Sequence, residues 1–220
     1  MLFLPNPHET GPVHTRIMAL RDGLVNMYII RASTALVCID TGWRASRIRK
    51  GFATLNLNIR DVAAVFLTHL HWDHAGCAGL FPDATIFVGE HEPPALVVNR
   101  PKSSPLWVKV CDNQEITVAD LSVRIVNTPG HSAGSVSLLV DEKFLFTGDG
   151  LRLRQGKALS FPSWCNQDQH SHIRSIRRLS GISGVEWLLT GHSGVSDNLD
   201  LAFSRWRTPA FCQGPKGENH

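Results

Sequence analysis

The sequence predicts an α/β (α+β) protein, and two β-sheets with helices on their outer sides would accommodate its elements. The chain has 220 residues, a length that suits one layered domain better than two independent ones. Apolar residues make up 43% of it, which is enough for a buried core and excludes global disorder. Strand-like and helix-like segments alternate along the chain, although periodicity alone does not choose this architecture.

The first half of the chain is predicted to contain short strands and one amphipathic helix. In the helix, Ile48, Phe52 and Leu55 recur at helical spacing, with Arg and Lys side chains opposite. The apolar run 62–67 has the length of a strand and the composition of one buried on both faces. The predicted strands are 25–30, 35–40, 62–67 and 84–88, and the predicted helix is 46–57.

The second half begins with an irregular, proline-rich stretch over 93–105 and then returns to strands. A helix is predicted over 168–179, where Ile173, Ile176 and Leu179 would face inward. Residues 209–220 hold Gly, Pro and Lys with little apolar content, so we predict one domain over 1–208 and a flexible tail. The predicted strands are 115–118, 121–126, a hairpin of 135–140 with 144–147, and 186–190.

Charge and composition narrow the class of partner and the compartment. A net charge of +3, without a long Lys/Arg block, does not predict nucleic-acid binding. The start of the chain does not resemble a signal peptide, and no apolar run reaches membrane-spanning length. The five cysteines are scattered and form no CxxC pair, which is typical of reduced thiols, so we expect a cytoplasmic protein.

Potential metal ligands recur where an apolar strand ends close to a glycine. This happens in the segments 66–76, 127–134, 146–150 and 189–194. Each segment places a His or an Asp in a loop at the C-terminal end of a predicted strand, which is how rigid scaffolds hold functional groups. The candidate ligands are His69, His71, Asp73, His74, His131, Asp149 and His192.

Five imidazoles and two carboxylates are more than one tetrahedral ion needs. They suit Zn²⁺ or another first-row metal, and two ions that share a carboxylate would use them all. The pKa of a water held by such an ion falls from about 15.7 to about 7, which makes it a nucleophile near neutral pH. His170 and His172 would point to different faces of their helix, so they are not predicted to bind metal.

These motifs make the sequence resemble the metallo-β-lactamase superfamily. The HxHxDH signature stands at 69–74, and the later family ligands are matched by His131, Asp149 and His192. The segment Ile39-Asp40-Thr41-Gly42 is similar to an early Asp-Thr-Gly segment of the family, so the resemblance extends from Val25 to His192. It implies a four-layer αββα sandwich, a hydrolase domain over 1–208, and metals at one edge of the sheets.

The resemblance also implies a role for each ligand. The first metal would be held by His69, His71 and His131, the second by Asp73, His74 and His192, and Asp149 would bridge them. A bridging hydroxide would attack the substrate, and Asp73 would be the catalytic residue that orients it or moves a proton. Asp40 either fixes the second ring nitrogen of a ligating histidine or is only a turn residue. Two divalent ions are expected, with zinc first and manganese or iron as alternatives.

The reaction implied is hydrolysis of a small ester, thioester or lactone, as in relatives of the glyoxalase II and lactonase type. The unbroken HxHxDH run favours hydrolysis, because redox members of the family replace the second His with Glu. Lactonases often use a tyrosine after the bridging Asp, whereas the one tyrosine here is Tyr28. A mononuclear iron sulfur dioxygenase, a phosphodiester hydrolase and a binding module with structural metals are the alternatives. We expect a small-molecule substrate, and a monomer or homodimer.

The stretch 151–166 is a candidate wall of the substrate pocket. It contains the apolar side chains Leu151, Leu153, Phe161 and Trp164, together with Arg152 and Arg154. Such a wall would suit an acyl substrate that carries a negative group. Ordinary loop packing explains the same residues equally well.

Overall fold

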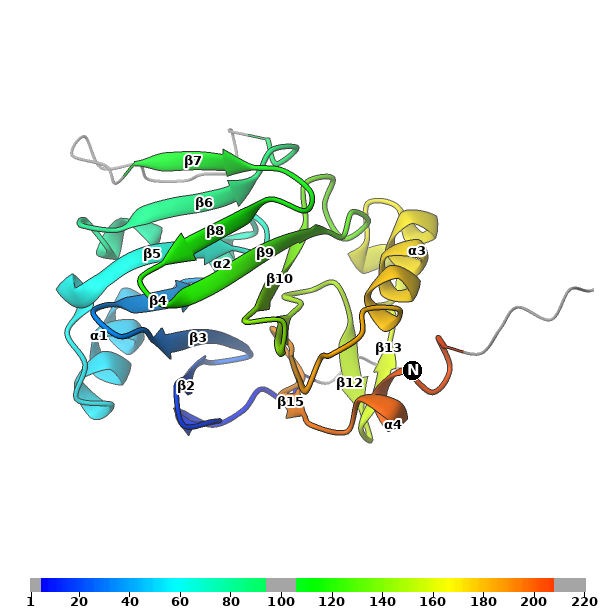
Figure 1. Cartoon of the computed structure of the whole chain (residues 1–220), viewed down its shortest axis with the longest axis horizontal. Helices are drawn as coiled ribbons and strands as arrows, with labels where there is room; N and C mark the ends of the chain where they lie inside the picture. Colours follow the sequence, from blue (N-terminus) through cyan, green and yellow to red (C-terminus); the bar gives the residue numbers. More distant parts are fainter. Residues whose placement is uncertain (1–4, 94–105, 208–220) are drawn as a thin grey trace, which may run out of the picture.

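Two β-sheets pack face to face, with helices on the outer side of each (Figure 1). The computed structural model describes residues 5–93 and 106–207. This arrangement confirms the predicted αββα order of layers. The predicted tail 209–220 and nearly all of the irregular stretch 93–105 lie outside the described residues, so the domain boundary at 208 stays a prediction.

The first sheet has the strand order β1-β2-β3-β4-β5-β6-β7. Strands β1 to β4 pair antiparallel, and β4 to β7 pair parallel. Parallel neighbours place the carboxyl ends of β5 and β6 at the same edge, where functional loops gather. The bounds are β1 Gly11–Pro12, β2 Ile17–Asp22, β3 Val25–Arg31, β4 Leu36–Ile39, β5 Val62–Leu67, β6 Thr85–Gly89 and β7 Trp107–Val110.

The second sheet has the order β15-β14-β11-β10-β9-β8. Its strands pair antiparallel except for β11 with β14, which are parallel. A separate hairpin, β12 with β13, follows β11. The bounds are β8 Glu115–Val118, β9 Leu121–Asn127, β10 Val136–Val140, β11 Phe144–Phe146, β12 Arg152–Arg154, β13 Lys157–Leu159, β14 Trp187–Leu189 and β15 Val195–Ser196.

The alternation of side chains in each strand divides the apolar residues among three layers of core. In β5, Ala64 and Phe66 face the second sheet, whereas Val65 and Leu67 face the helices outside. In β10, Leu138 faces the first sheet. Because both faces of these strands are covered, they are apolar almost throughout, as the sequence predicted for 62–67.

The helices cover the outer faces of the sheets with their apolar sides. In α1, Ile48 and Phe52 pack against the first sheet, and in α3, Ile176 and Leu179 pack against the second. Asp168 caps α3, because its Oδ1 accepts hydrogen bonds from the backbone N–H groups of the first turn. The bounds are α1 Ala45–Thr54, α2 Trp72–Ala75, α3 Gln169–Ser180 and α4 Leu199–Phe203.

Several elements were not predicted from the sequence. Strands β2 and β7 complete the first sheet through pairing with β3 and β6, and the hairpin β12–β13 lies where only a loop was expected. Helix α1 ends at Thr54 rather than at residue 57, since Asn56 has a left-handed backbone conformation with φ of 54°. These short elements depend on partners elsewhere in the fold more than on their own patterns.

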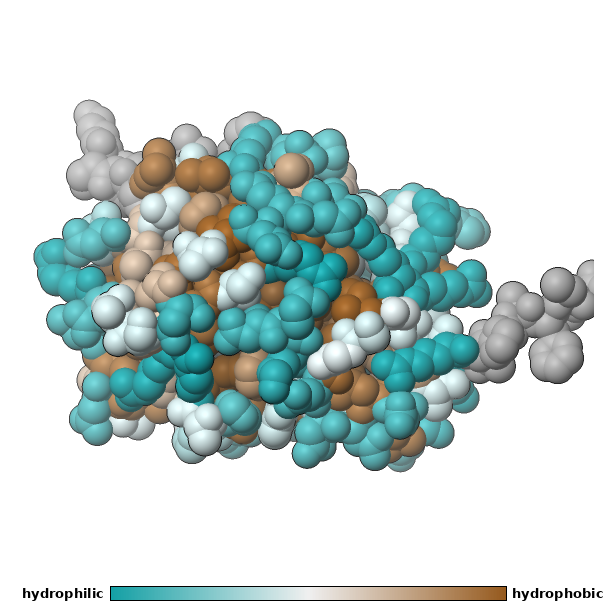
Figure 2. Space-filling model, in the orientation of Figure 1, coloured by the Kyte–Doolittle hydropathy of each residue, from teal (hydrophilic) through white to brown (hydrophobic). Residues whose placement is uncertain are grey.

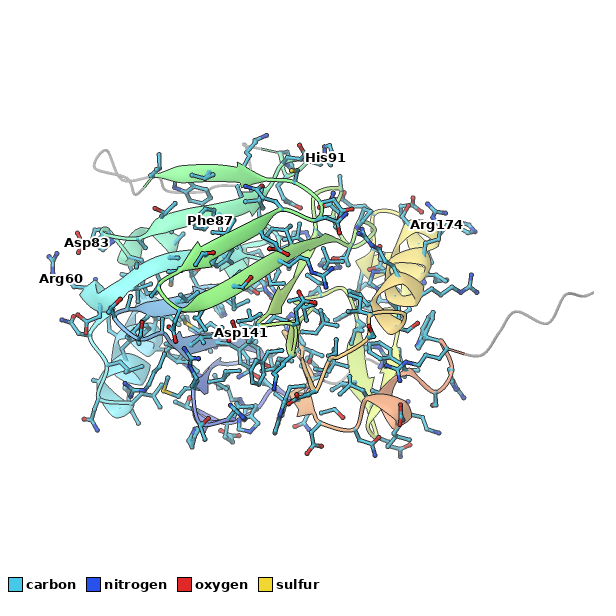
Figure 3. The ribbon with its side chains drawn as sticks, viewed as in Figure 1. Arg60, Asp83, Phe87, His91, Asp141 and Arg174 are labelled. Atoms are coloured by element: carbon cyan, nitrogen blue, oxygen red, sulfur yellow. The ribbon has the colours of Figure 1, made fainter. Side chains whose placement is uncertain are left out.

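The surface is a mosaic of hydrophilic and smaller hydrophobic areas on the face shown in Figure 2. Among its charged groups, Arg60 and Asp83 form an exposed pair at the edge of the first sheet, with Nη1 and Oδ2 3.1 Å apart (Figure 3). Exposed pairs of this kind contribute about 0–1 kcal/mol to stability. Within the described residues, no helix is both long and apolar enough to cross a membrane, and the four cysteines are free thiols. The cytoplasmic location stays a prediction.

Candidate metal centre

Four loops bring all seven predicted ligands to one edge of the sandwich. His69 and His71 follow β5, with Asp73 and His74 next in α2. The second sheet supplies the others: His131 from the loop between β9 and β10, Asp149 after β11, and His192 after β14. Within the described residues, the groups able to hold a metal are His69–His71–His131, His69–His74–Asp149 and Asp73–His74–His192.

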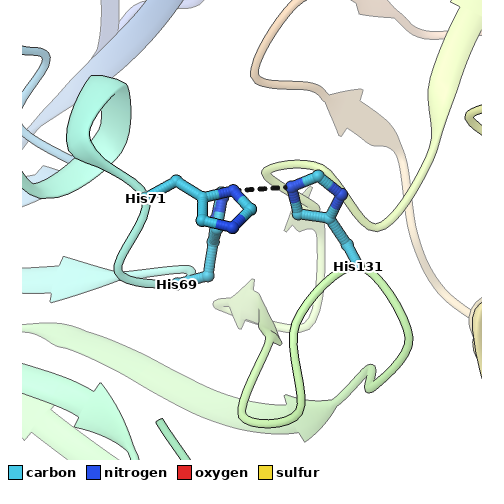
Figure 4. A group of neighbouring side chains, drawn as sticks. All are labelled: His69, His71 and His131. Atoms are coloured by element: carbon cyan, nitrogen blue, oxygen red, sulfur yellow. Dashed lines mark hydrogen bonds between the residues drawn. The ribbon is translucent and has the colours of Figure 1, made fainter. Parts of the chain in front are cut away.

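The first group consists of three imidazoles that face one another across the two sheets (Figure 4). His71 Nδ1 and His131 Nε2 are 2.9 Å apart. His69 Nε2 is buried and has no hydrogen-bond partner. Burial lowers the pKa of both His69 and His131, so these rings favour the neutral form that ligates metals.

The group of Asp73, His74 and His192, which we call the second group, lies beside Asp149. His192 Nε2 lies 3.3 Å from His74 Nε2 and 3.4 Å from Asp73 Oδ2. Asp149 Oδ1 is 3.3 Å from His192 Nε2 and 3.4 Å from His74 Nε2, and His74 Nε2 is 3.8 Å from Asp73 Oδ2. Ligands of a tetrahedral zinc ion stand about 3.3 Å apart, given metal–ligand bonds of roughly 2.0–2.1 Å. The spacing of these donors therefore fits one divalent ion.

Asp149 joins the two groups. Its Oδ1 faces His74 and His192, whereas its Oδ2 lies 3.3 Å from His131 Nε2 in the first group. Burial alone would raise the pKa of this carboxyl, but the charges of His192 and His74 hold it well below its usual range. Asp149 Oδ1 is buried without a hydrogen-bond partner. An ionised carboxylate oxygen that lies between imidazoles without a hydrogen bond fits a bridging metal ligand, since buried polar atoms otherwise almost always have one.

Asp40 binds the ring nitrogen of His74 that points away from the other candidate ligands. Its Oδ2 accepts a hydrogen bond from His74 Nδ1 at 2.7 Å, and its Oδ1 accepts one from the backbone N–H of Thr68 at 2.8 Å. Burial lowers the pKa of His74, but Asp149 and Asp40 together raise it well above its usual value. Of the two roles predicted for Asp40, the structure shows the one that fixes a ring nitrogen, and this leaves His74 Nε2 facing Asp149 and His192.

Gly191 is required by the closeness of the ligands. A Cβ atom at this position would lie 2.8 Å from His74 Cε1 and 2.9 Å from Asp149 Oδ1. Since both atoms belong to buried side chains, neither has room to move away. The glycine before His192 therefore lets the β14 loop approach the other ligand loops.

Glu92 is a residue that the sequence analysis missed. It is buried, and its carboxylate accepts a hydrogen bond from the backbone N–H of Leu70, which lies between two ligands, at 3.3 Å. The same carboxylate also accepts a bond from Ser132 Oγ, beside His131. Gly134 allows this approach, because a Cβ there would lie 2.1 Å from Glu92 N. Glu92 thus connects the two loops that carry the first group of histidines.

We expect Glu92→Ala to weaken metal retention and to lower the free energy of unfolding by about 1–3 kcal/mol, because buried donors lose their acceptor. Titration calorimetry with zinc and denaturant melts would measure the two effects. Glu92→Gln should restore most of both, since an amide can accept from Leu70 and donate to Ser132. Glu90→Ala, at an exposed neighbour, is the matched control. Unchanged zinc affinity in Glu92→Ala would contradict this role.

The stretch 151–166 divides between core packing and contact with the ligands. Leu151 and Ala158 are buried in the core beneath α3. Phe161 stands with its ring centroid 5.8 Å from that of His131, and Asn166 Oδ1 lies 3.3 Å from His131 Nδ1. In the following helix His172 is buried and His170 is exposed, which confirms that they occupy different faces. His91 is also exposed, at the surface after β6 (Figure 3).

The fold and the cluster together define a class: αββα proteins that hold divalent metal between two sheets. A profile of the metallo-beta-lactamase superfamily matches residues 20–192, and the chain belongs to that superfamily. Among solved structures, a metallo-beta-lactamase family protein from Thermus thermophilus has a TM-score of 0.69 at 23% identity, covering 89% of this chain and 79% of that one. This likeness shows the shared fold.

Three relatives have names that describe hydrolases. The chain is 28% identical to a probable metallo-hydrolase of Methanocaldococcus jannaschii, over 72% of this chain and 71% of the relative. It is 26% identical to a hydroxyacylglutathione hydrolase of Glaesserella parasuis, over 86% and 73%. It is 28% identical to an atrochrysone carboxyl ACP thioesterase of Aspergillus fumigatus, over 89% of this chain and 61% of that longer protein. The predicted class, a metal-dependent hydrolase of this superfamily, is confirmed.

Proposed function

We propose that this protein is a dinuclear hydrolase of a small ester, thioester or lactone. The observation that carries the proposal is the position of Asp149, whose two oxygens face two different groups of donors. One ion would use only one of these groups. His69, His71 and His131 would hold the first ion, Asp73, His74 and His192 the second, and Asp149 would serve both.

Two such ions, when bound, would supply a water of lowered pKa and polarise the carbonyl oxygen of the substrate. The chain contributes the shape and the proton path. Asp73 is the most accessible carboxylate of the cluster, with its side chain 21% exposed against 8% for Asp149. Its carboxylate is therefore the one most open to an incoming substrate, and the oxygen not used for the second ion would orient the attacking water or carry its proton.

A small substrate with a reactive carbonyl is favoured by the names of two relatives and by the low net charge of the chain. Of the relatives described above, one is named a thioesterase and another a hydroxyacylglutathione hydrolase. The net charge of +3 gives no strong attraction for a polyanion, so a small molecule is favoured over nucleic acid. Tyr28 donates its hydroxyl to the backbone oxygen of Thr190 and is buried, so it does not take the place of a lactonase tyrosine.

Metal analysis beside a panel of esters, thioesters, lactones and phosphodiesters tests the proposal. We expect about two ions per chain and hydrolysis of a carbonyl substrate. Removal of metal by a chelator should abolish the activity and lower Tm by about 5–10 °C, since bound ligands stabilise the folded state by mass action. Zinc should restore both. One iron per chain, with oxygen uptake on a persulfide, would instead identify a sulfur dioxygenase.

A further inference from the structure

The outer ring nitrogens of His74 and His131 meet side chains of different kinds. His74 Nδ1 donates to the carboxylate of Asp40, whereas His131 Nδ1 lies 3.3 Å from Asn166 Oδ1. An amide can present either an oxygen acceptor or an N–H donor, so it fixes a ring only if the amide is itself held in one orientation. The groups that hold Asn166 therefore decide which nitrogen of His131 carries the hydrogen.

The orientation of the Asn166 amide follows from a backbone carbonyl, which can only accept. Phe161 O accepts hydrogen bonds from Ser160 Oγ at 2.9 Å and from Asn166 Nδ2 at 3.4 Å. Asn166 Nδ2 also donates to Gln169 Oε1 at 2.6 Å, and Gln169 Nε2 donates to Ser160 Oγ at 2.9 Å. Since Nδ2 is the donor in both of its contacts, the acceptor Oδ1 is the atom left for His131.

This orientation fixes the hydrogen of a neutral His131 ring on Nδ1. The oxygen of Asn166 has no hydrogen to give, so the imidazole nitrogen beside it has to be the donor. The other nitrogen, Nε2, then keeps a free lone pair. It faces His71 Nδ1 at 2.9 Å (Figure 4) and Asp149 Oδ2 at 3.3 Å. A lone pair directed at other donor groups is what a metal ligand needs.

The segment around Asn166 also holds the main chain of the His131 loop. Gln167 N donates to His131 O at 3.3 Å, and Asp168 N donates to Gly130 O at 2.9 Å. Gln167 Oε1 in turn accepts a bond from the backbone N–H of Ala133 at 3.1 Å. Gly130 allows this approach, because a Cβ there would lie 2.3 Å from a backbone nitrogen of α3. The ring is therefore placed before an ion arrives, which lowers the entropy cost of binding.

We propose that Asn166 is a positioning residue for the first ion and that Gln169 holds its amide in the orientation required. This proposal rests on the proposed function, which assigns His131 to that ion, and it adds a residue that sets how tightly the ion is held. Asn166 acts through His131 and is not itself a ligand. Its amide is uncharged, in contrast to the carboxylate of Asp40 beside His74, so the two rings are held by partners of different strength.

Zinc titration of variants tests this role. In an Asp73→Ala background, which removes a candidate ligand of the second ion only, the first ion is the tighter step seen by calorimetry. We expect Asn166→Ala to weaken that step by about 10–100-fold. Asn166→Asp should retain the affinity, because a carboxylate also accepts from His131 and Gln169 can turn its amide to donate to it. Ser163→Ala, at an exposed residue of the same loop, is the matched control.

Nuclear magnetic resonance separates this proposal from the hydrolytic one. Long-range proton–nitrogen spectra of the metal-free protein at about pH 8, where an imidazole is neutral, show which ring nitrogen carries the hydrogen. We expect Nδ1 for His131, and we expect Asn166→Ala to lose this preference. That result supports the role of Asn166 even if no substrate is hydrolysed. Hydrogen on Nε2 in the unaltered chain, or an equal loss of zinc affinity in Asn166→Ala and Asn166→Asp, would overturn the role and leave the hydrolase intact.

Discussion

Replacing Asp149 by Ala is expected to reduce bound metal from about two ions per chain to one or fewer and to lower kcat by about 10³-fold or more. The carboxylate is the group that faces both sets of donors, so its loss removes a ligand from each. It also removes a negative charge that lies among the imidazoles and would offset the charge of bound cations. Elemental analysis and steady-state kinetics on the purified variant measure the two effects.

Asp200→Ala is a suitable control for Asp149→Ala. Asp200 lies in α4, is 95% exposed, and pairs with Arg207 at the surface. Its loss should change the free energy of unfolding by about 1 kcal/mol or less and leave metal content unchanged. If Asp149→Ala keeps two ions and full activity while Asp200→Ala behaves as expected, Asp149 is not the ligand that the two ions share, and the proposed mechanism is wrong.

Replacing Asp40 by Asn is expected to lower metal affinity by about 10–100-fold, with a smaller loss of stability. Both carboxylate oxygens are in use, one for His74 Nδ1 and one for the N–H of Thr68. An amide has a single acceptor oxygen, so one of the two donors loses its partner. Asn tolerates the left-handed backbone at this position, where φ is 60°, so backbone strain does not add to the measured loss of metal affinity.

Asp40→Ala gives the larger and less specific effect. It leaves both buried donors without an acceptor and places a Cβ-bearing residue without a polar group at positive φ. We expect the free energy of unfolding to fall by about 3–5 kcal/mol. Zinc titration of Asp40→Asn is the decisive measurement. A variant that binds zinc as tightly as the unaltered chain would show that Asp40 serves only the turn.

The cluster of candidate ligands could be predicted because the information is local. His69, His71, Asp73 and His74 stand within six positions after an apolar strand, and few structural roles require such a run. Strand β5 has the bounds predicted from its composition, since it is buried on both faces. Glu92 could not be found in this way. Its partners, Leu70 and Ser132, lie 22 and 40 residues away, and a single glutamate carries no pattern of its own.

The missed elements share a physical cause. Strand β2 forms because it pairs along its whole length with β3. The sequence of β2 alone does not indicate this partner. The hairpin β12–β13 is three residues on each side and is held by packing of Ala158 and neighbours under α3. Trp43 and Trp72 looked unrelated in the sequence, because only the fold places the loop after β4 against α2.

The ligands come from both sheets, so the centre can exist only when the two halves of the chain have met. The loop after β5 and helix α2 belong to the first sheet, and the other three loops belong to the second. Captured ions would then act as a cross-link between segments far apart in the sequence, in the manner of a disulfide. Phe66 and Phe146 belong to the core that the two sheets share, so a change in the packing of this core would shift one set of candidate ligands relative to the other. Substitutions in that core can therefore lower metal affinity and activity without changing any candidate ligand.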